Sequence, residues 1–418
     1  MRADIHGAFV PPMTDRSARG HRREESDLFA LVERLPFVGS MARELAELRA
    51  LLVDRRPPRV LCLGAPGSGK STLANALLRA DVLPSLPAPA HDGAAPEVPH
   101  ARAPESDTTP PFAASMVAHG AWARVSARSR QLAWLELSSS EEPFDRETGR
   151  LLRNALEEHA PDVVVVLLRG ARAEDELPAA TASLERVREL LGERAEALRV
   201  LPVVTGADEL VLPSPFARPP YPTDAMALIE RATLLAKTRL DGAGVIPGGV
   251  PRAVPCACPA DTSARWNLEE VADALYARLP SETHVEAVRA LPVGTSQVRE
   301  LARSVVNHCA AMAVTVGLAP IPFSDSLVLV PLQALMVTAV AYVAGQPWDR
   351  RAALEWVGSL GVMGGAAFGL RYGAQQLVKL VPGAGTLVSA SIAGAGTLAL
   401  GRSAIAYFVD GPGRRAHA

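Results

Sequence analysis

This chain of 418 residues has few cysteines, few lysines and almost no net charge. Its four cysteines are too few to frame a secreted disulfide domain, so we expect a protein of the reducing cytoplasm. A net charge of −2 provides no overall field that would attract nucleic acid or anionic lipid, and no nucleic-acid partner is indicated. The first 25 residues carry charged side chains throughout and no apolar run, so we expect no secretory signal there.

The charged residues are unevenly distributed, and their distribution predicts the domains. Only eight Asp, Glu, Lys or Arg residues fall between 304 and 409, whereas such residues make up 21% of the chain. A hydrophobic content of 48% excludes disorder over most of the length. We therefore expect a disordered arm with amphipathic helices at 1–55, a first folded domain at 56–280 and an apolar helical domain at 281–418.

Apolar β-rich runs alternate with helical stretches between residues 59 and 280, which predicts a doubly wound, mostly parallel α/β sheet. The expected strands lie at 60–64, 114–125, 131–137, 162–168, 198–205 and 253–258. The expected helices lie at 70–79, 146–159, 180–194, 224–240 and 267–279. The Pro- and Ala-rich stretch 80–111 is longer than an ordinary connection, and such loops are usually functional or disordered.

A phosphate-binding loop follows the first expected strand. The sequence GAPGSGKS matches GxxxxGK[ST] and leads into a helical run, so a strand, a glycine-rich loop and a helix occur in the required order. Glycines let several backbone N–H groups converge on one phosphate, the lysine ammonium reaches the β and γ phosphates, and the serine hydroxyl binds Mg²⁺. The chain has only three lysines, and one of them occupies this motif position. The residues expected to bind nucleotide here are Gly64, Ala65, Pro66, Gly67, Ser68, Gly69, Lys70, Ser71 and Thr72.

These residues resemble the Era-like branch of the translation-factor-related GTPases over about residues 59–280. The resemblance implies GTP or GDP and Mg²⁺ as ligands, with Thr109 as a second Mg²⁺-binding residue that senses the γ phosphate; an ordinary Ser/Thr-Pro loop is the alternative. It also implies that Thr205 to Asp208 replaces the guanine-reading NKxD motif, although the Asp208 carboxylate could instead cap a helix. By the same resemblance, Cys256 and Ala257 stand where a backbone N–H meets the guanine oxygen; read as a metal site, the Cys-x-Cys pair is weak.

Three departures from that family pattern bear on activity. Glu136 and Ser139 stand where the family has the Asp and Gly of DxxG, and Gly206 replaces the lysine that stacks on the base. The expected catalytic residues are Lys70, Thr109 and Glu136, with Glu136 holding a Mg²⁺-bound water. We therefore predict a weak or partner-dependent GTPase, with a nucleotide-binding pseudo-GTPase that acts as a scaffold as the alternative.

A third interpretation is a P-loop kinase that acts on small molecules. It would use phosphate-binding arginines, for which Arg169 and Arg172 after the fourth strand are candidates. That interpretation leaves Asp208 without a role, and we rank it last.

The apolar C-terminal region permits contact with a membrane. Residues 326–345 contain no ionisable group and are long enough to span a bilayer, but a buried helical hairpin is an equal alternative. Residues 380–401 also lack charge, and glycines at 361, 365, 369 and 373 would form one bare helical stripe suited to close packing.

The segment from Pro320 to Asp325, followed by Gln333, resembles the C-terminal domain shared by a set of bacterial GTPases and the inner-membrane protein YcjF. This resemblance implies a bacterial, cytoplasmic protein associated with the inner membrane, or with a membrane protein, through these helices. Asp325 and Gln333 could pair with a partner helix or simply satisfy the hairpin itself.

Overall fold

The computed structural model describes residues 42–80, 83, 123–127, 130–142, 144, 146–211, 218–318, 328–348 and 384–411. The chain divides into two compact units. The first, the α/β unit, runs from Arg55 to Leu301, whereas the expected domain ends at 280. The second, the helical unit, combines the residues before Arg55 with those from Ala302 onward.

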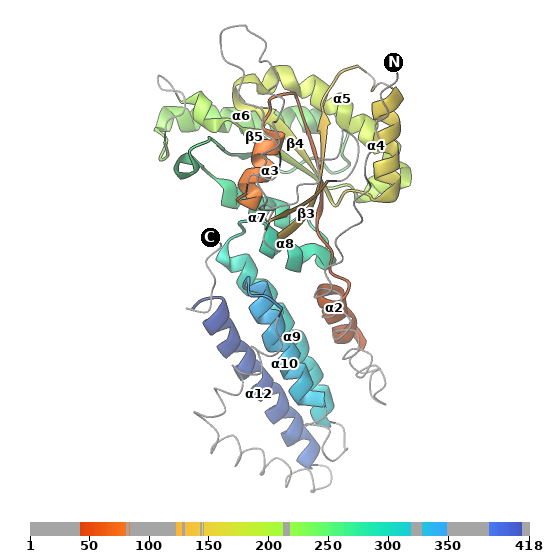
Figure 1. Ribbon diagram of the computed structural model, residues 1–418, viewed down its shortest axis with the longest axis vertical. Coiled ribbons are helices and arrows are strands. Elements are labelled where there is room, and N and C mark those ends of the chain that lie inside the picture. Colours follow the sequence, from red (N-terminus) through yellow and green to blue (C-terminus); the bar gives the residue numbers. More distant parts are fainter. Residues whose placement is uncertain are drawn as a thin grey trace, which may run out of the picture. The chain divides into compact units, whose positions relative to one another are not determined.

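A sheet forms the centre of the α/β unit (Figure 1). Its six strands follow the order β2-β3-β1-β4-β5-β6. Five strands are parallel and β2 runs antiparallel to β3, which confirms the predicted mostly parallel α/β fold. The strands are β1 (Arg59–Gly64), β2 (Ala123–Ala127), β3 (Arg130–Ser138), β4 (Val163–Arg169), β5 (Val200–Thr205) and β6 (Val254–Pro255).

The central strand β1 positions the candidate site. It pairs with β3 on one side, where Cys62 lies opposite Glu136, and with β4 on the other, where Gly64 lies opposite Leu167. The strand order therefore reverses at β1, and the carboxyl ends of β1, β3, β4 and β5 meet at one edge of the sheet. Ligands of open α/β sheets bind at such an edge.

Helices of the described residues flank the sheet (Figure 1). They are α3 (Lys70–Leu78), α4 (Arg146–Glu158), α5 (Ala173–Leu191), α6 (Thr223–Gly242), α7 (Leu268–Tyr276) and α8 (His284–Ala290). Helix α5 begins seven residues before the expected helix at 180–194 and includes Pro178, a residue type that is unfavourable inside a helix.

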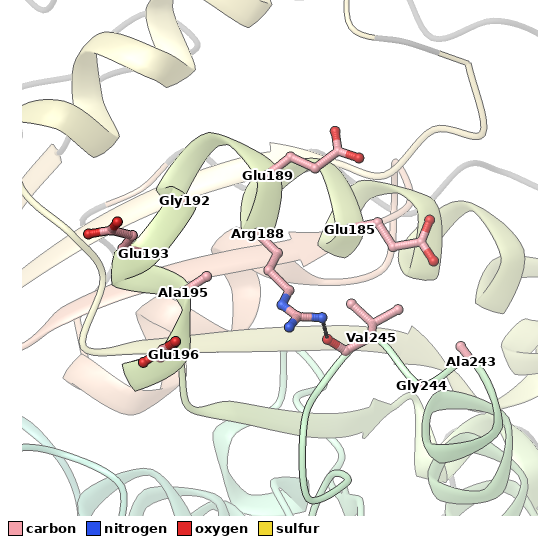
Figure 2. A pocket seen from close by; sticks show the side chains of 10 residues that line it. All are labelled: Glu185, Arg188, Glu189, Gly192, Glu193, Ala195, Glu196, Ala243, Gly244 and Val245. Carbon is pink, nitrogen blue, oxygen red and sulfur yellow. Dashed lines mark hydrogen bonds between the residues drawn. The ribbon is translucent and has the colours of Figure 1, made fainter.

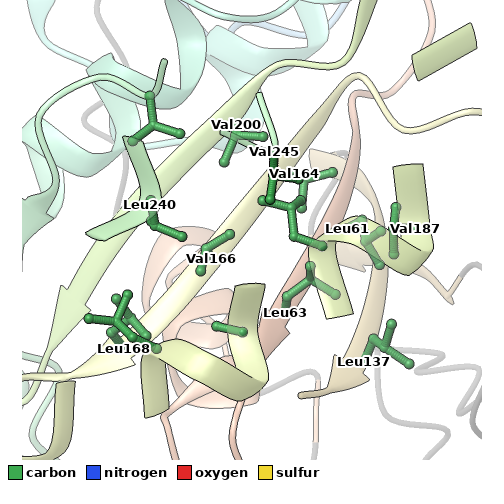
Figure 3. Packing of buried hydrophobic residues seen from close by; sticks show 14 of the residues in the cluster. Leu61, Leu63, Leu137, Val164, Val166, Leu168, Val187, Val200, Leu240 and Val245 are labelled. Carbon is green, nitrogen blue, oxygen red and sulfur yellow. The ribbon is translucent and has the colours of Figure 1, made fainter. Parts of the chain in front are cut away.

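A large apolar cluster of described residues lies between one face of the sheet and helices α4, α5 and α6 (Figure 3). It includes Leu61 and Leu63 of β1, Val164 and Val166 of β4, and Val187 of α5, all fully or almost fully buried. Because side chains alternate along a strand, their neighbours point to the other face, which α3, α7 and α8 contact. The sheet is thus covered on both faces, and polar ligands have access at its edges.

An ion-pair cluster ties the start of β1 to the start of β4 and to the segment before α8. The Arg56 guanidinium donates to both carboxylate oxygens of Asp162 at 2.7 Å and to Glu282 Oε1 at 3.2 Å. Asp162 also accepts the Arg59 N–H at 2.8 Å. These contacts form at the amino ends of the strands, the edge opposite the candidate site.

The helical unit contains α2 (Ala42–Leu52), most of α9 (Thr295–Leu318), α10 (Val330–Val343) and α12 (Ala384–Phe408). Helix α10 lies within the 326–345 stretch whose length permits a span, but it has 14 residues and is about 21 Å long at 1.5 Å per residue. Most of its residues are buried within the chain. Among the described helices, only α9 is long and apolar enough to cross a membrane, and 56% of its apolar window is buried.

Two kinds of contact hold α12 in this unit. Gln333 Nε2 of α10 donates to Thr397 Oγ1 at 3.1 Å, so of the two roles considered for Gln333, it satisfies a polar group inside the unit. Two glycines of α12, Gly394 and Gly401, lie close to α9: a Cβ placed on Gly401 would lie 2.4 Å from Val306 Cγ1. The predicted glycine stripe at 361–373 and Asp325 fall outside the described residues.

Candidate functional site

The predicted phosphate-binding loop joins β1 to α3 as expected. Gly67 and Gly69 adopt φ values of 78° and 93°, the left-handed region that favours glycine. A Cβ on Gly64 would lie 2.4 Å from Ser68 Oγ and 3.0 Å from the Leu167 carbonyl oxygen, so this position also needs glycine. The first backbone bond of the helix runs from Leu73 N to Gly69 O at 2.8 Å. The N–H groups of the residues just before Leu73 are therefore those that a helix leaves for an anion.

Lys70 is the buried cation of this loop. Its side-chain ammonium donates to the carbonyl oxygens of Gly64 at 2.9 Å and Ala65 at 3.0 Å, and the residue is 9% exposed. Burial lowers the pKa of Lys70, and the nearby carboxylates of Glu136 and Glu176 oppose that effect. The ammonium thus lies against the loop's own carbonyls, within the segment where the motif predicts phosphate.

A hydroxyl and a carboxylate meet beside the loop. Ser71 Oγ donates to Glu136 Oε2 at 2.9 Å, and Trp134 Nε1 donates to Glu136 Oε1 at 3.0 Å. The pair comes from the first turn of α3 and from β3; the sequence analysis predicts Ser71 as a Mg²⁺-binding residue and Glu136 as the holder of a Mg²⁺-bound water. Oxygen donors of these types suit Mg²⁺, which keeps several waters and takes few protein ligands. Thr109, the other predicted Mg²⁺-binding residue, lies outside the described residues.

Ser139 occupies the position where the resembled family has the glycine of DxxG. Its N–H donates to the carbonyl oxygen of Gly64 at 3.0 Å, which extends the pairing of β3 with β1 by one more bond. In this conformation the N–H is therefore directed at the chain and not at a phosphate. This bond is consistent with the weak or partner-dependent GTPase that the departure at Ser139 predicts.

The Thr205 to Asp208 segment follows β5 and contacts the phosphate-binding loop. Thr205 Oγ1 donates to the Ser68 carbonyl at 2.7 Å, and Gly206 has a left-handed φ of 66° before η4 (Ala207–Leu210). Asp208 is 5% exposed, and burial raises the pKa of its carboxyl, with Glu209 adding to the effect and Arg169 opposing it. The predicted base-reading carboxylate thus lies near the loop but is buried among its neighbours.

Cys256 and Ala257 already use their N–H groups within the protein. The Cys256 N–H donates to Val204 O at 2.8 Å, and the Ala257 N–H donates to Trp266 O at 3.1 Å, a bond that Trp266 returns at 3.0 Å. A guanine oxygen could meet the Ala257 N–H only after the Trp266 pair opens. The role that the resemblance implies for these two residues therefore does not fit this conformation.

Aromatic rings and thiols lie around Asp208 and Cys256. The Tyr221 and Trp266 rings lie 5.1 Å apart, and burial, followed by the charge of Asp208, raises the pKa of Tyr221 to about 12. Cys256 is fully buried, as are Cys62 and Cys309, whereas Cys258 is partly exposed. Within the described residues no group of three or more His, Cys, Asp or Glu could hold a metal ion.

Sequence reasoning missed the ion pair that joins the two loops. Arg169, the last residue of β4, donates from Nε to Glu209 Oε2 at 2.7 Å and from NH2 to Glu209 Oε1 at 2.6 Å. Its NH1 also reaches the Gly67 carbonyl of the phosphate-binding loop at 3.3 Å. From the sequence, Arg169 is a candidate only for a phosphate-binding arginine of a kinase, whereas in the structure it ends β4 at the sheet edge. The sequence did contain a signal for this pair. The carboxyl ends of neighbouring parallel strands meet, so an arginine at the end of the fourth strand is expected near Glu209, which directly follows Asp208 after the fifth strand.

A separate hollow of about 490 Å³ lies between the end of α5 and the segment after α6 (Figure 2). The Arg188 guanidinium lies within it and donates to the Val245 carbonyl. The side chains of Glu185, Glu189 and Glu193 point away from Arg188 and are exposed (Figure 2). The three glutamates thus face solvent and Arg188 already donates to a carbonyl oxygen. The hollow is therefore a weaker candidate for a ligand-binding site than the phosphate-binding loop at the edge of the sheet.

Comparison with known proteins adds little. No protein-family model matches the sequence, and no curated protein matches it. Among solved structures, a variant of Era from Aquifex aeolicus bound to GDP and AlF4⁻ is 17% identical over 62% of this chain and 68% of the other, with a TM-score of 0.29. A TM-score this low does not establish a common fold.

Proposed function

We propose that this protein binds a guanine nucleotide with Mg²⁺ at the loop between β1 and α3 and hydrolyses GTP weakly or with a stimulating partner. One observation carries the proposal: Lys70, the Ser71–Glu136 pair and the start of α3 lie together at the sheet edge where the strand order reverses. A nucleoside triphosphate needs a cation, a Mg²⁺-binding hydroxyl and backbone donors at one place. Lys70, Ser71 and the first-turn N–H groups of α3 would supply these three, which supports the proposal.

The chain's own residues would divide this work. The first-turn N–H groups of α3 and the Lys70 ammonium would bind the phosphates, for which Lys70 must leave the Gly64 and Ala65 carbonyls. Ser71 would bind Mg²⁺, and Glu136 would orient a water on that ion while Trp134 holds its second oxygen. The bound Mg²⁺ would neutralise charge on the phosphates. Asp208 would read the base.

A second function is favoured by Ser139. Because its N–H already donates to Gly64 O, the chain could bind nucleotide without sensing or removing the γ phosphate. The protein would then act as a nucleotide-binding scaffold. Either function would serve the helical unit, which we propose acts as a module associated with the inner membrane or with a membrane protein.

The test is binding of labelled GTP, GDP and ATP to the full chain with Mg²⁺, with phosphate release followed in the same samples. Lys70→Ala should abolish binding, and Asp208→Ala should remove the preference for guanine. Lys237→Ala is the matched control, because Lys237 pairs with Asp241 on α6. Slow release supports the GTPase and binding without release supports the scaffold. Binding that does not depend on Lys70 would overturn both.

A further inference from the structure

Arg169 connects the two loops that a nucleotide would have to contact at once. Its guanidinium makes two bonds to Glu209, directly after Asp208, and one to the Gly67 carbonyl of the phosphate-binding loop. The side chain is 20% exposed and that of Glu209 22%. The charges of Glu176 and Asp208 also act on Arg169, and together with Glu209 they raise its pKa. The guanidinium is thus fixed in place at the site and remains partly open to solvent.

The backbone at Gly206 leaves room for the Glu209 side chain, which holds the Arg169 guanidinium. Gly206 has no side chain, and a Cβ placed there would lie 3.2 Å from Glu209 Cδ. Glu209 therefore lies over Gly206, where a longer residue at 206 would otherwise project. The two bonds to Glu209 hold the guanidinium by its Nε and NH2 edge, which defines the plane of the group.

We infer that Arg169 is a base-positioning residue: its guanidinium plane, held by Glu209, is the surface on which the purine ring of the bound nucleotide stacks. This inference rests on the proposed function. A ligand with phosphates at the loop and a base at Asp208 must pass the group that joins Gly67 to Glu209. Guanidinium groups stack on aromatic faces, and a planar, delocalised cation does so better than an ammonium.

The experiment compares a ligand that has a base with one that has none. Affinities of GDP and of inorganic tripolyphosphate, each with Mg²⁺, are measured for the full-length wild type and for Arg169→Ala, Arg169→Lys and Glu209→Gln. Arg169→Ala should weaken GDP about tenfold and tripolyphosphate less than about threefold, because only GDP has a ring to stack. Arg169→Lys should restore only part of the GDP affinity, and Glu209→Gln should lower it less than Arg169→Ala does.

Arg231→Ala is the matched control, since Arg231 is an exposed arginine on α6. Hydrogen exchange of the Gly67 to Gly69 amides in the ligand-free chain reports whether the variants keep the loop intact. Equal losses for GDP and tripolyphosphate would overturn the inference, because Arg169 would then act only through the phosphate-binding loop. Tighter GDP binding by Arg169→Ala would also overturn it, because the ion pair would then block the base. If neither ligand binds in a Lys70-dependent way, the proposed function fails and this inference fails with it.

Discussion

Alanine substitutions at three glycines of α12 should have three different effects on the stability of the helical unit. At Gly401 the new methyl would lie 2.4 Å from Val306 Cγ1, 2.6 Å from Cγ2 and 3.0 Å from Cβ. Rotation of Val306 cannot clear all three contacts, because its Cβ position is fixed by the backbone and the residue is buried. Overpacking costs about 1–3 kcal/mol, and alanine regains about 1 kcal/mol of helix propensity. Gly401→Ala should therefore destabilise the unit by up to about 2 kcal/mol.

The other two glycines are internal controls on the same helix. At Gly394 the methyl would lie 2.4 Å from Val314 Cγ2, but Val314 Cβ is 3.8 Å away and the residue is 37% exposed, so a rotamer change removes the clash. Gly394→Ala should be close to neutral. At Gly396 nothing lies within 4 Å, so Gly396→Ala should stabilise the helix by about 0.5–1 kcal/mol.

Hydrogen exchange of the α12 amides measures this order without interference from the α/β unit. Val306→Ala placed in the Gly401→Ala background should recover part of the loss, since it removes the two methyl groups that clash. Equal effects at the three glycines, or stabilisation by Gly401→Ala, would refute the close packing of α12 on α9.

Three further predictions concern buried polar groups. Gln333→Leu or Thr397→Val alone should lower the stability of the helical unit by about 1–3 kcal/mol, because each single change leaves the other polar atom unpaired. The double variant should be close to neutral, since neither polar atom remains. Amide hydrogen exchange of α10 measures these changes in stability. Arg56→Met or Asp162→Asn should cost the α/β unit about 3 kcal/mol in denaturant unfolding, with a large coupling energy in the double variant. Asp208→Asn should stabilise the α/β unit at neutral pH and much less near pH 4, in denaturant unfolding at several pH values. Burial raises the native pKa of Asp208, so its contribution to stability is greatest at low pH and is lost as the pH rises through that pKa.

Each of these three has a contrasting measurement. The Arg218–Asp261 pair has the same 2.7 Å distance but lies on the surface, so its coupling energy should be below about 1 kcal/mol. A coupling as small at Arg56 and Asp162 would contradict the role given to their burial. Additive losses at Gln333 and Thr397 would contradict the hydrogen bond between them. A pH-independent effect of Asp208→Asn would contradict the raised pKa.

The sequence predicted the sheet and the phosphate-binding loop because both depend on local pattern. Apolar β-rich runs and glycine spacing are properties of consecutive residues, and β1, β3, β4, β5 and the loop lie where those patterns placed them. By contrast, β2 runs to Ala127, beyond the expected 114–125, and β6 covers only Val254–Pro255 of the expected 253–258. The boundaries were less predictable. Helix α5 begins at Ala173 despite Pro178, since contacts with the sheet outweigh the local preference of one proline.

The pairings on the base side of the site join distant residues, and the motif comparison did not predict them. The Ala257 N–H bonds Trp266 and Arg169 bonds Glu209, 40 residues further along the chain. Motif resemblance assigns roles by position and cannot show that a backbone donor is already in use. The sequence shows that Ser139 and Gly206 depart from the family pattern. Their effects on the site depend on the atoms next to them, Gly64 O for Ser139 and the Glu209 carboxylate for Gly206, which only the structure shows.

Because the other three cysteines are buried, Cys258 is a natural position for a spectroscopic label. Cys62, Cys256 and Cys309 are fully buried, so a thiol-specific fluorophore or spin label added to the folded protein should attach at Cys258. That residue directly follows Ala257, whose bond with Trp266 must open if guanine is to be read there. A single label on the unaltered chain would therefore register that opening as a spectroscopic change, in real time and without substituting any residue.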